Sequence, residues 1–142
     1  MQEHQSSQSR GQLLELATGE GKTLVIATFA SIKALVNGGR KVDIACSSSI
    51  LAEADAVECQ EFYKYLGLTS SHLPSNEDRM AKRAAYQADI VYGTVADFSA
   101  DILKKKFDEV DMRNGRDVDE CCLIVDEVDN LTIDEVSIVF NQ

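Results

Sequence analysis

Histidine and paired cysteine, which most often hold zinc in proteins, are scarce in this sequence. It has only two histidines, His4 and His72, and its four cysteines form no Cys-x-x-Cys pair, so a zinc site is not expected. Three of the cysteines lie within or beside apolar runs that are typical of strands: Cys46, Cys121 and Cys122. A free cysteine in such a run usually behaves as a small buried hydrophobe in a reducing compartment.

Long apolar runs are also lacking. No stretch approaches the roughly 20 apolar residues that span a bilayer, so no transmembrane segment is expected. Residues 1–10 are polar, rich in Gln and Ser, and unlike a signal peptide. We therefore expect a soluble chain with a disordered leader over residues 1–10.

Basic residues are outnumbered by acidic ones. The 24 Asp and Glu residues exceed the 14 Lys and Arg residues and give a formal charge of -10. Such a surface repels a phosphate backbone, which disfavours extended binding to nucleic acid but leaves a local phosphate site open. A chain of 142 residues, 44% of them hydrophobic, has the size and composition of a single domain.

From Gly11 onward, short apolar runs alternate with longer helical stretches, and no internal repeat is visible. This order predicts an α/β fold, with a mostly parallel sheet flanked by helices. Residues 126–142 lack a terminating cap, so we expect the domain to be incomplete at its carboxyl end. The predicted strands are 13–17, 42–46, 68–73, 88–93 and 121–125, and the predicted helices are 22–37, 51–66, a short helix from a cap at Ser75 to about 87, and 95–107.

The sequence also predicts how several of these elements begin, end and pack. The helix at 22–37 is apolar nearly all round, so it should be buried on more than one side. Serines at 47–49 can cap the next helix, and Gly67 can end it. Ser75 and Asp78 are predicted to form a capping box.

The remaining polar stretches are interpreted as solvated. Lys104, Lys105 and Lys106 should complement a helix end, and the alternative is that they meet an acidic membrane surface. The loop 108–120 should be exposed, with Asn114 and Gly115 forming a turn. The tyrosines on the predicted helices and strands are expected to pack rather than to stack on bases: Tyr63, Tyr65 and Tyr92.

A glycine-bearing segment lies between the first predicted strand and the first helix. Backbone amides and the positive end of the helix dipole meet at such a point and attract phosphate. The glycines let the backbone fold around an oxyanion, Lys22 supplies a cation, and the hydroxyl of Thr23 can ligate magnesium. The predicted nucleotide-binding residues are Thr18, Gly19, Glu20, Gly21, Lys22 and Thr23.

The match to a phosphate loop covers only the second half of the general pattern. A strict P-loop has a glycine where this chain has Leu16. The shortened form Gly-x-Gly-Lys-Thr resembles that of DEAD-box-like helicases and their relatives. The alternative for this segment is a glycine-rich turn with a chance lysine.

An acidic pair follows the last predicted strand. Asp126 and Glu127 would lie at the carboxyl end of that strand, where parallel sheets bind ligands. Asp126 suits magnesium, and Glu127 suits a base that orients the attacking water. The predicted catalytic residues are thus Glu127 and Lys22, and the predicted metal ligands are Thr23 and Asp126. An acidic pair alone is more often the start of a solvated loop, and only its combination with Lys22 indicates a nucleotide site.

Most of the chain from Gly11 onward resembles the SecA preprotein translocase ATPase family, in its first RecA-like, DEAD-type nucleotide-binding domain. Thr18-Gly19-Glu20-Gly21-Lys22-Thr23 resembles the family's phosphate loop, and Asp126-Glu127-Val128-Asp129 its Walker B motif. The stretches 47–58 and 89–101 are also similar, and so is Ile133-Asp134-Glu135. Val136-Ser137 departs from the family's Ala-Arg-Thr-Pro.

The resemblance implies a RecA-like P-loop NTPase lobe over residues 11–142, partial and without its second lobe. It implies ATP and Mg²⁺ as cofactors and, in the full-length protein, an ATPase that moves unfolded polypeptide. The implied partners are an unfolded preprotein, a membrane translocation channel and a second RecA-like lobe, and no nucleic acid is expected. The implied location is cytoplasmic, with peripheral association with a membrane.

Two other functions fit the same residues. The chain could be a superfamily 2 nucleic-acid helicase lobe, which salt-dependent stimulation by RNA or DNA would favour. It could also be a non-catalytic nucleotide-binding interaction module. No arginine lies in a motif typical of an arginine finger, so we expect the isolated chain to bind nucleotide with little turnover.

Overall fold

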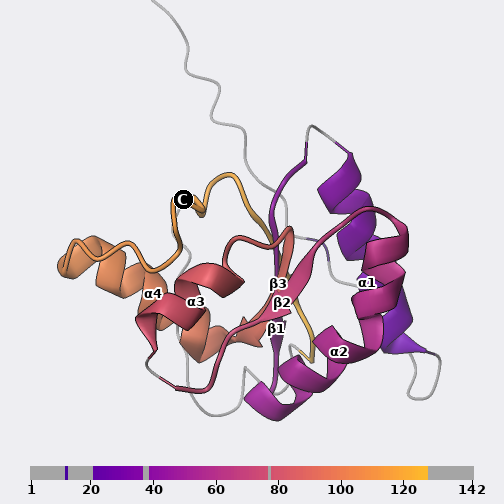
Figure 1. The fold of residues 1–142 in the computed structure, drawn as a ribbon, viewed down its shortest axis with the longest axis horizontal. Coiled ribbons are helices and arrows are strands. Elements are labelled where there is room, and N and C mark those ends of the chain that lie inside the picture. Colours follow the sequence, from indigo (N-terminus) through magenta and orange to yellow (C-terminus); the bar gives the residue numbers. More distant parts are fainter. Residues whose placement is uncertain (1–11, 13–20, 37–38, 77, 128–142) are drawn as a thin grey trace, which may run out of the picture.

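The computed structural model describes residues 12, 21–36, 39–76 and 78–127. Helices and strands alternate along this part of the chain (Figure 1). The predicted strand at 13–17 and the segment 128–142 lie outside the described residues. The elements are α1 (Lys22–Leu35), β1 (Val42–Cys46), α2 (Ser49–Tyr65), β2 (Ser70–His72), α3 (Arg79–Ala85), β3 (Ile90–Thr94), α4 (Val95–Phe107) and β4 (Cys122–Val125).

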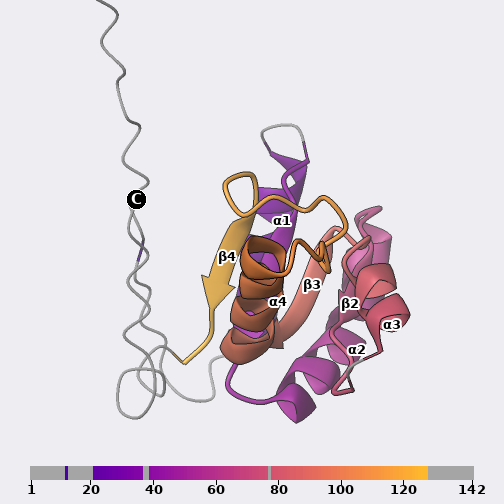
Figure 2. The same cartoon turned by 90° about the vertical axis from the view of Figure 1, so that its left-hand side faces the viewer.

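The four strands form a parallel sheet in the order β2-β3-β1-β4, and Val42 pairs with both Ile90 and Cys122. The predicted fold class is therefore confirmed. Alternate residues of β1 point to opposite faces: Val42 and Ile44 pack under α1 and α2, whereas Ala45 packs towards α4. Figure 2 shows β4 at one edge of the sheet and α3 beyond β2 at the other.

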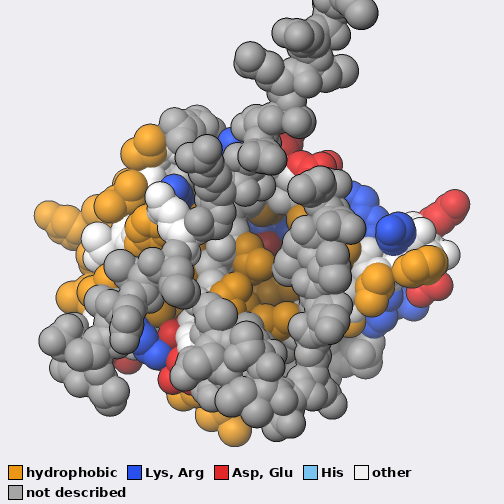
Figure 3. Space-filling view, turned by 180° about the vertical axis from the view of Figure 1, so that it is seen from behind, with side chains coloured by type: hydrophobic (Ala, Val, Ile, Leu, Met, Phe, Trp, Pro, Cys, Tyr) orange, Lys and Arg blue, Asp and Glu red, His pale blue; other side chains and the backbone are white. Residues whose placement is uncertain are grey.

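The first helix is buried on one side only, so the prediction of burial on several sides is wrong. Its buried residues are small and allow a close approach to the sheet: Ala27, Ala30, Ser31 and Ala34. Leu24 and Ile32 are 58% and 50% exposed. Hydrophobic side chains are visible along the side of the molecule where α1 lies (Figure 3). Most large apolar residues of α1 thus face outward, whereas Ile26 packs against the core.

Side-chain caps fix the starts of three helices. Ser48 caps α2, accepting from the amide of Leu51, and Thr94 forms a capping box with Asp97 at α4. The predicted capping box at Ser75 is wrong. Asp78 itself caps α3, because its carboxylate accepts from the amides of the first turn. The helix therefore begins at Arg79.

The tyrosines predicted to pack behave differently from one another. The hydroxyls of Tyr63 and Tyr92 are 2.6 Å apart and buried between α2 and the sheet. Tyr65 is 89% exposed, so its predicted packing is wrong. It lies two residues after Tyr63 on the helix and therefore points to a different side.

The loop before β4 is anchored rather than solvated, contrary to the prediction. Arg113 and Arg116 donate to the two oxygens of Asp43, at 2.7 and 2.8 Å, and all three side chains are buried. Arg116 also donates to the carbonyls of Val42 and Ala88. Asp43 is the second residue of β1, so its burial requires a cationic partner. The predicted turn does form, with positive φ at Asn114 and Gly115.

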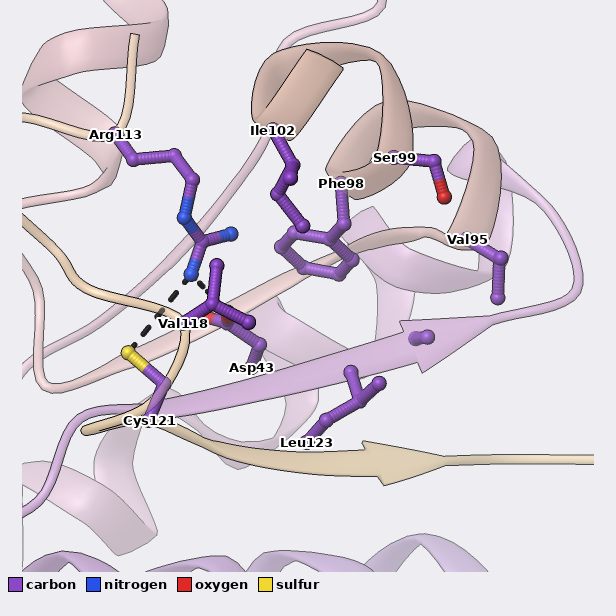
Figure 4. A pocket seen from close by; sticks show the side chains of 10 residues that line it. Asp43, Val95, Phe98, Ser99, Ile102, Arg113, Val118, Cys121 and Leu123 are labelled. Atoms are coloured by element: carbon purple, nitrogen blue, oxygen red, sulfur yellow. Dashed lines mark hydrogen bonds and ion pairs between the residues drawn. The ribbon is translucent and has the colours of Figure 1, made fainter. Parts of the chain in front are cut away.

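A cavity of about 50 Å³ lies beside this cluster, on the face of the sheet covered by α4. Figure 4 shows Arg113 pointing at Asp43 on one side of it, and Phe98, Ile102 and Leu123 lining the other. Most of its lining is apolar. Neither Lys22 nor Asp126 takes part in it.

Replacing Asp43 by Ala should destabilise the fold by about 3 to 5 kcal/mol, because two buried guanidinium groups lose their counter-charge. Urea unfolding of the full chain measures this change. Asp119→Ala is the matched control, since Asp119 is exposed in the same loop, and it should change the unfolding free energy by less than about 0.5 kcal/mol. An equal effect of the two substitutions would show that the cluster does not hold the loop.

Candidate functional site

The candidate site lies at the edge of the sheet where the parallel strands end. β1 ends at Cys46 and β4 at Val125, and the two strands are paired in register. The amide of Asp126 donates to the carbonyl of Ala45 at 2.9 Å, which continues the ladder one residue beyond β4. The acidic pair is therefore positioned by the sheet.

Lys22 reaches this edge from the first turn of α1. Gly21, the residue that starts the helix, has a left-handed backbone with φ of 71°, a conformation that glycine adopts without steric cost. The ammonium of Lys22 lies 2.8 Å from Oδ1 of Asp126 and 3.2 Å from Oε1 of Glu127. Lys22 and Glu127 are 105 positions apart in the sequence. The structure thus brings the glycine turn and the acidic pair together.

Glu127 has an unusual backbone conformation. Its φ is 56°, one of three positive values among the described non-glycine residues. A side chain with a Cβ carries a cost of about 1 kcal/mol or more in this region, and such residues cluster at functional sites. In this conformation, the carboxylate of Glu127 accepts a hydrogen bond from Lys22.

Charge at the site favours a protonated Lys22. The hydrogen bond that Lys22 donates to Asp126 raises the pKa of Lys22 above its ordinary value, against the opposing effect of desolvation, and Glu127 adds to the increase. Lys22 therefore remains a cation at neutral pH. The stability from this contact is present below pH 10.5, the ordinary value, and is lost as the pH rises through the higher pKa of the folded state.

Sequence reasoning missed two residues close to the acidic pair. Burial raises the pKa of Cys46 to about 12, and the charges of Asp55, Asp126 and Glu127 add to this effect. Burial, and then the charge of Asp126, also raise the pKa of Asp55. Asp55 lies on α2 beside the buried Ala52 and Ala56. An acidic residue next to the buried face of a predicted helix is the sequence pattern that could have identified Asp55.

The amino end of α1 carries no side-chain cap, whereas the other three described helices are capped. Its first helical bonds run from the amides of Leu24 and Val25 to the carbonyl of Gly21. The amides at the start of a helix have no partner within the helix and can bind an anion. Lys22, Thr23 and Gly21 thus form a place that suits phosphate.

The predicted phosphate loop lies within the described part of the chain only from Gly21 onward. Thr18, Gly19 and Glu20 lie outside the described residues, so their part in binding stays a prediction. Within the described ranges, no group of three or more His, Cys, Asp or Glu residues could hold a metal ion. The four cysteines all carry free thiols.

The parallel sheet, the helices on both of its faces and the lysine paired with acids at its carboxyl edge define an α/β lobe of the RecA-like class. Residues 6–139 match the family model described as SecA DEAD-like domain. The chain belongs to this family.

Curated relatives agree. The chain is 39% identical over 127 residues to the protein translocase subunit SecA of Dichelobacter nodosus, over 89% of this chain and 14% of the relative. It is 39% identical over 126 residues to the SecA subunit of Nitrosococcus oceani, over 88% of this chain and 14% of the relative. It is also 39% identical over 130 residues to SecA 2 of Mycolicibacterium vanbaalenii, again over 88% and 14%. The chain thus spans about 14% of the length of these relatives.

Among the described residues, no helix has the length and apolar character that crossing a membrane requires.

The raised pKa of Cys46 predicts slow alkylation in the folded chain. A rise from 9.0 to about 12 lowers the thiolate fraction at pH 8 about a thousandfold. Iodoacetamide labelling followed by mass spectrometry should therefore modify the half-buried Cys121 and Cys122 before Cys46. All four thiols should react alike in urea. Labelling of native Cys46 at the rate of Cys122 would contradict the described electrostatics.

Proposed function

We propose that this chain is the nucleotide-binding lobe of a SecA-type motor, which binds ATP with Mg²⁺ at the edge formed by Lys22, Asp126 and Glu127. The observation that carries the proposal is the contact between Lys22 and Asp126, at 2.8 Å. It unites a cation at an uncapped helix start with an acid at a strand end. These are the two halves of a site for a magnesium-bound triphosphate.

Each residue has a role in this proposal. The amides at the start of α1 and the ammonium of Lys22 hold the outer phosphates. Thr23 and Asp126 would hold a magnesium ion, which would neutralise phosphate charge. Glu127 orients the attacking water as its base. Thr18, Gly19 and Glu20 complete the phosphate loop.

The described residues fit a magnesium ion that the protein coordinates together with the phosphates of the nucleotide, rather than one that the protein holds by itself. Mg²⁺ usually keeps several waters and takes one or two carboxylates together with substrate phosphates. The carboxylate of Asp126 and the hydroxyl of Thr23 supply two protein ligands, and this number matches that requirement. This donor set supports a metal that binds together with nucleotide.

In the full-length protein, ATP hydrolysis would drive the movement of unfolded polypeptide. The SecA relatives are named as translocase subunits, and their names support a preprotein and a membrane channel as partners. A formal charge of -10 favours such partners over nucleic acid. A cytoplasmic location with peripheral membrane association is part of the same proposal.

Hydrolysis would require a second RecA-like lobe. In this superfamily, an arginine from the partner lobe stabilises the charge that develops in the transition state. Arg113 and Arg116 are buried against Asp43 and backbone carbonyls near the amino ends of β1 and β3. They are therefore committed to holding the loop.

Calorimetry with MgADP and MgATP tests the nucleotide site without requiring turnover. Lys22→Ala should weaken binding about 10- to 100-fold, since a charge-assisted hydrogen bond contributes roughly 1.5 to 3 kcal/mol. Lys33→Ala is the matched control, because it removes the same charge from the last turn of α1. Unchanged affinity in Lys22→Ala would overturn the assignment of the phosphate site.

The isolated chain should hydrolyse ATP slowly. Without the arginine of a second lobe, we expect a rate on the order of 10³ to 10⁵ fold below that of the full-length protein. Single-turnover measurements with an excess of chain over labelled ATP give this rate. Comparable rates for the chain and the full-length protein would mean that all catalytic groups lie within this lobe.

A further inference from the structure

Lys22 contacts the carboxylates that the proposal assigns to metal binding and to water activation. Its ammonium lies 2.8 Å from Oδ1 of Asp126 and 3.2 Å from Oε1 of Glu127. The contact with Asp126 has the length of a charge-assisted hydrogen bond, and the contact with Glu127 is slightly longer. One cation thus contacts both members of the acidic pair.

A divalent cation would compete with this ammonium for the same oxygen. Mg²⁺ binds carboxylate oxygen at about 2.0 to 2.1 Å, so it cannot share Oδ1 of Asp126 with an ammonium without close repulsion between like charges. We infer that Lys22 excludes free divalent cations from Asp126 and Glu127, so that the metal enters only with a nucleotide whose phosphates draw the ammonium away. The inference rests on the proposed function and adds an order of binding to it.

The side chain of Lys22 is able to make this exchange. It is 36% exposed, compared with 16% for Asp126, and it has a flexible stem with three rotatable donors. It starts in the first turn of α1, beside the amides that suit phosphate. A phosphate bound there would offer the ammonium a new anionic partner and release the carboxylates.

Removing the ammonium should leave a surplus of negative charge at this edge. Asp126 and Glu127 would lose the ammonium that both of them contact, and the charge of Asp55 adds to theirs. Two carboxylates with water are a weak but sufficient site for a divalent cation. Loss of Lys22 is therefore expected to increase metal affinity while it decreases nucleotide affinity.

Electron paramagnetic resonance with Mn²⁺ as the probe, on the full chain without nucleotide, tests this inference. Lys22→Gln should bind Mn²⁺ at least about tenfold more tightly than the wild type, through loss of like-charge repulsion. Lys22→Arg keeps the charge and should remain as weak as the wild type. Lys33→Ala is the control for net charge and should also match the wild type.

A second substitution locates the site. Asp126→Asn, introduced into Lys22→Gln, should return Mn²⁺ affinity to the wild-type level. Equal affinities of wild type and Lys22→Gln would overturn the inference, and so would a gain of the same size in Lys33→Ala. If Lys22→Gln does not fold, the Mn²⁺ affinity of the wild type is compared with and without saturating ADP. Equal affinities under the two conditions would overturn the inference.

The experiments distinguish failure of the proposed binding order from failure of the proposed nucleotide site. Failure of the wild type to bind MgADP in calorimetry would count against the nucleotide site, whatever Mn²⁺ does. Nucleotide binding together with unchanged Mn²⁺ affinity in Lys22→Gln would leave the site intact and remove only the order of binding.

Discussion

The parallel pairing of β1 with β4 is the constraint on which the candidate site depends. Because both strands run in the same direction, their carboxyl ends meet at one edge, and the bond from Asp126 to Ala45 extends the pairing to the acidic residue itself. Lys22 reaches the same edge because α1 packs small residues closely against the sheet. A shift in the register of β4 would move Asp126 away from the lysine and separate the charges.

Charged residues are buried at one end of the sheet and partly exposed at the other. Near the amino ends of β1 and β3, Asp43 is buried between two arginines that also bind backbone carbonyls. At the carboxyl end, Lys22 and Glu127 are both more than a third exposed. A buried and fully bonded cluster holds a loop in place, whereas a partly exposed ion pair can exchange partners. The charges at the carboxyl edge are therefore the ones that can respond to a ligand.

The SecA relatives are much longer than this chain. The chain covers about 14% of the SecA subunits that it matches, and the described part of it forms one α/β lobe. Leu24, Ile32 and Leu35 of α1 are exposed, and large exposed hydrophobic patches usually mark an interaction surface.

Local patterns in the sequence determined most of the fold. The alternation of apolar strands and helices predicted the α/β class, the limits of β1 and α4, and the left-handed turn at Gly67. The residue types around Lys22 and Asp126 predicted which groups would meet, because motifs after parallel strands share one edge. Only the tertiary structure decided that α1 is covered on one side, that Arg113 and Arg116 are buried on Asp43, and that Asp55 and Cys46 border the acidic pair. These features depend on contacts between residues far apart in the chain, whose partners no local pattern specifies.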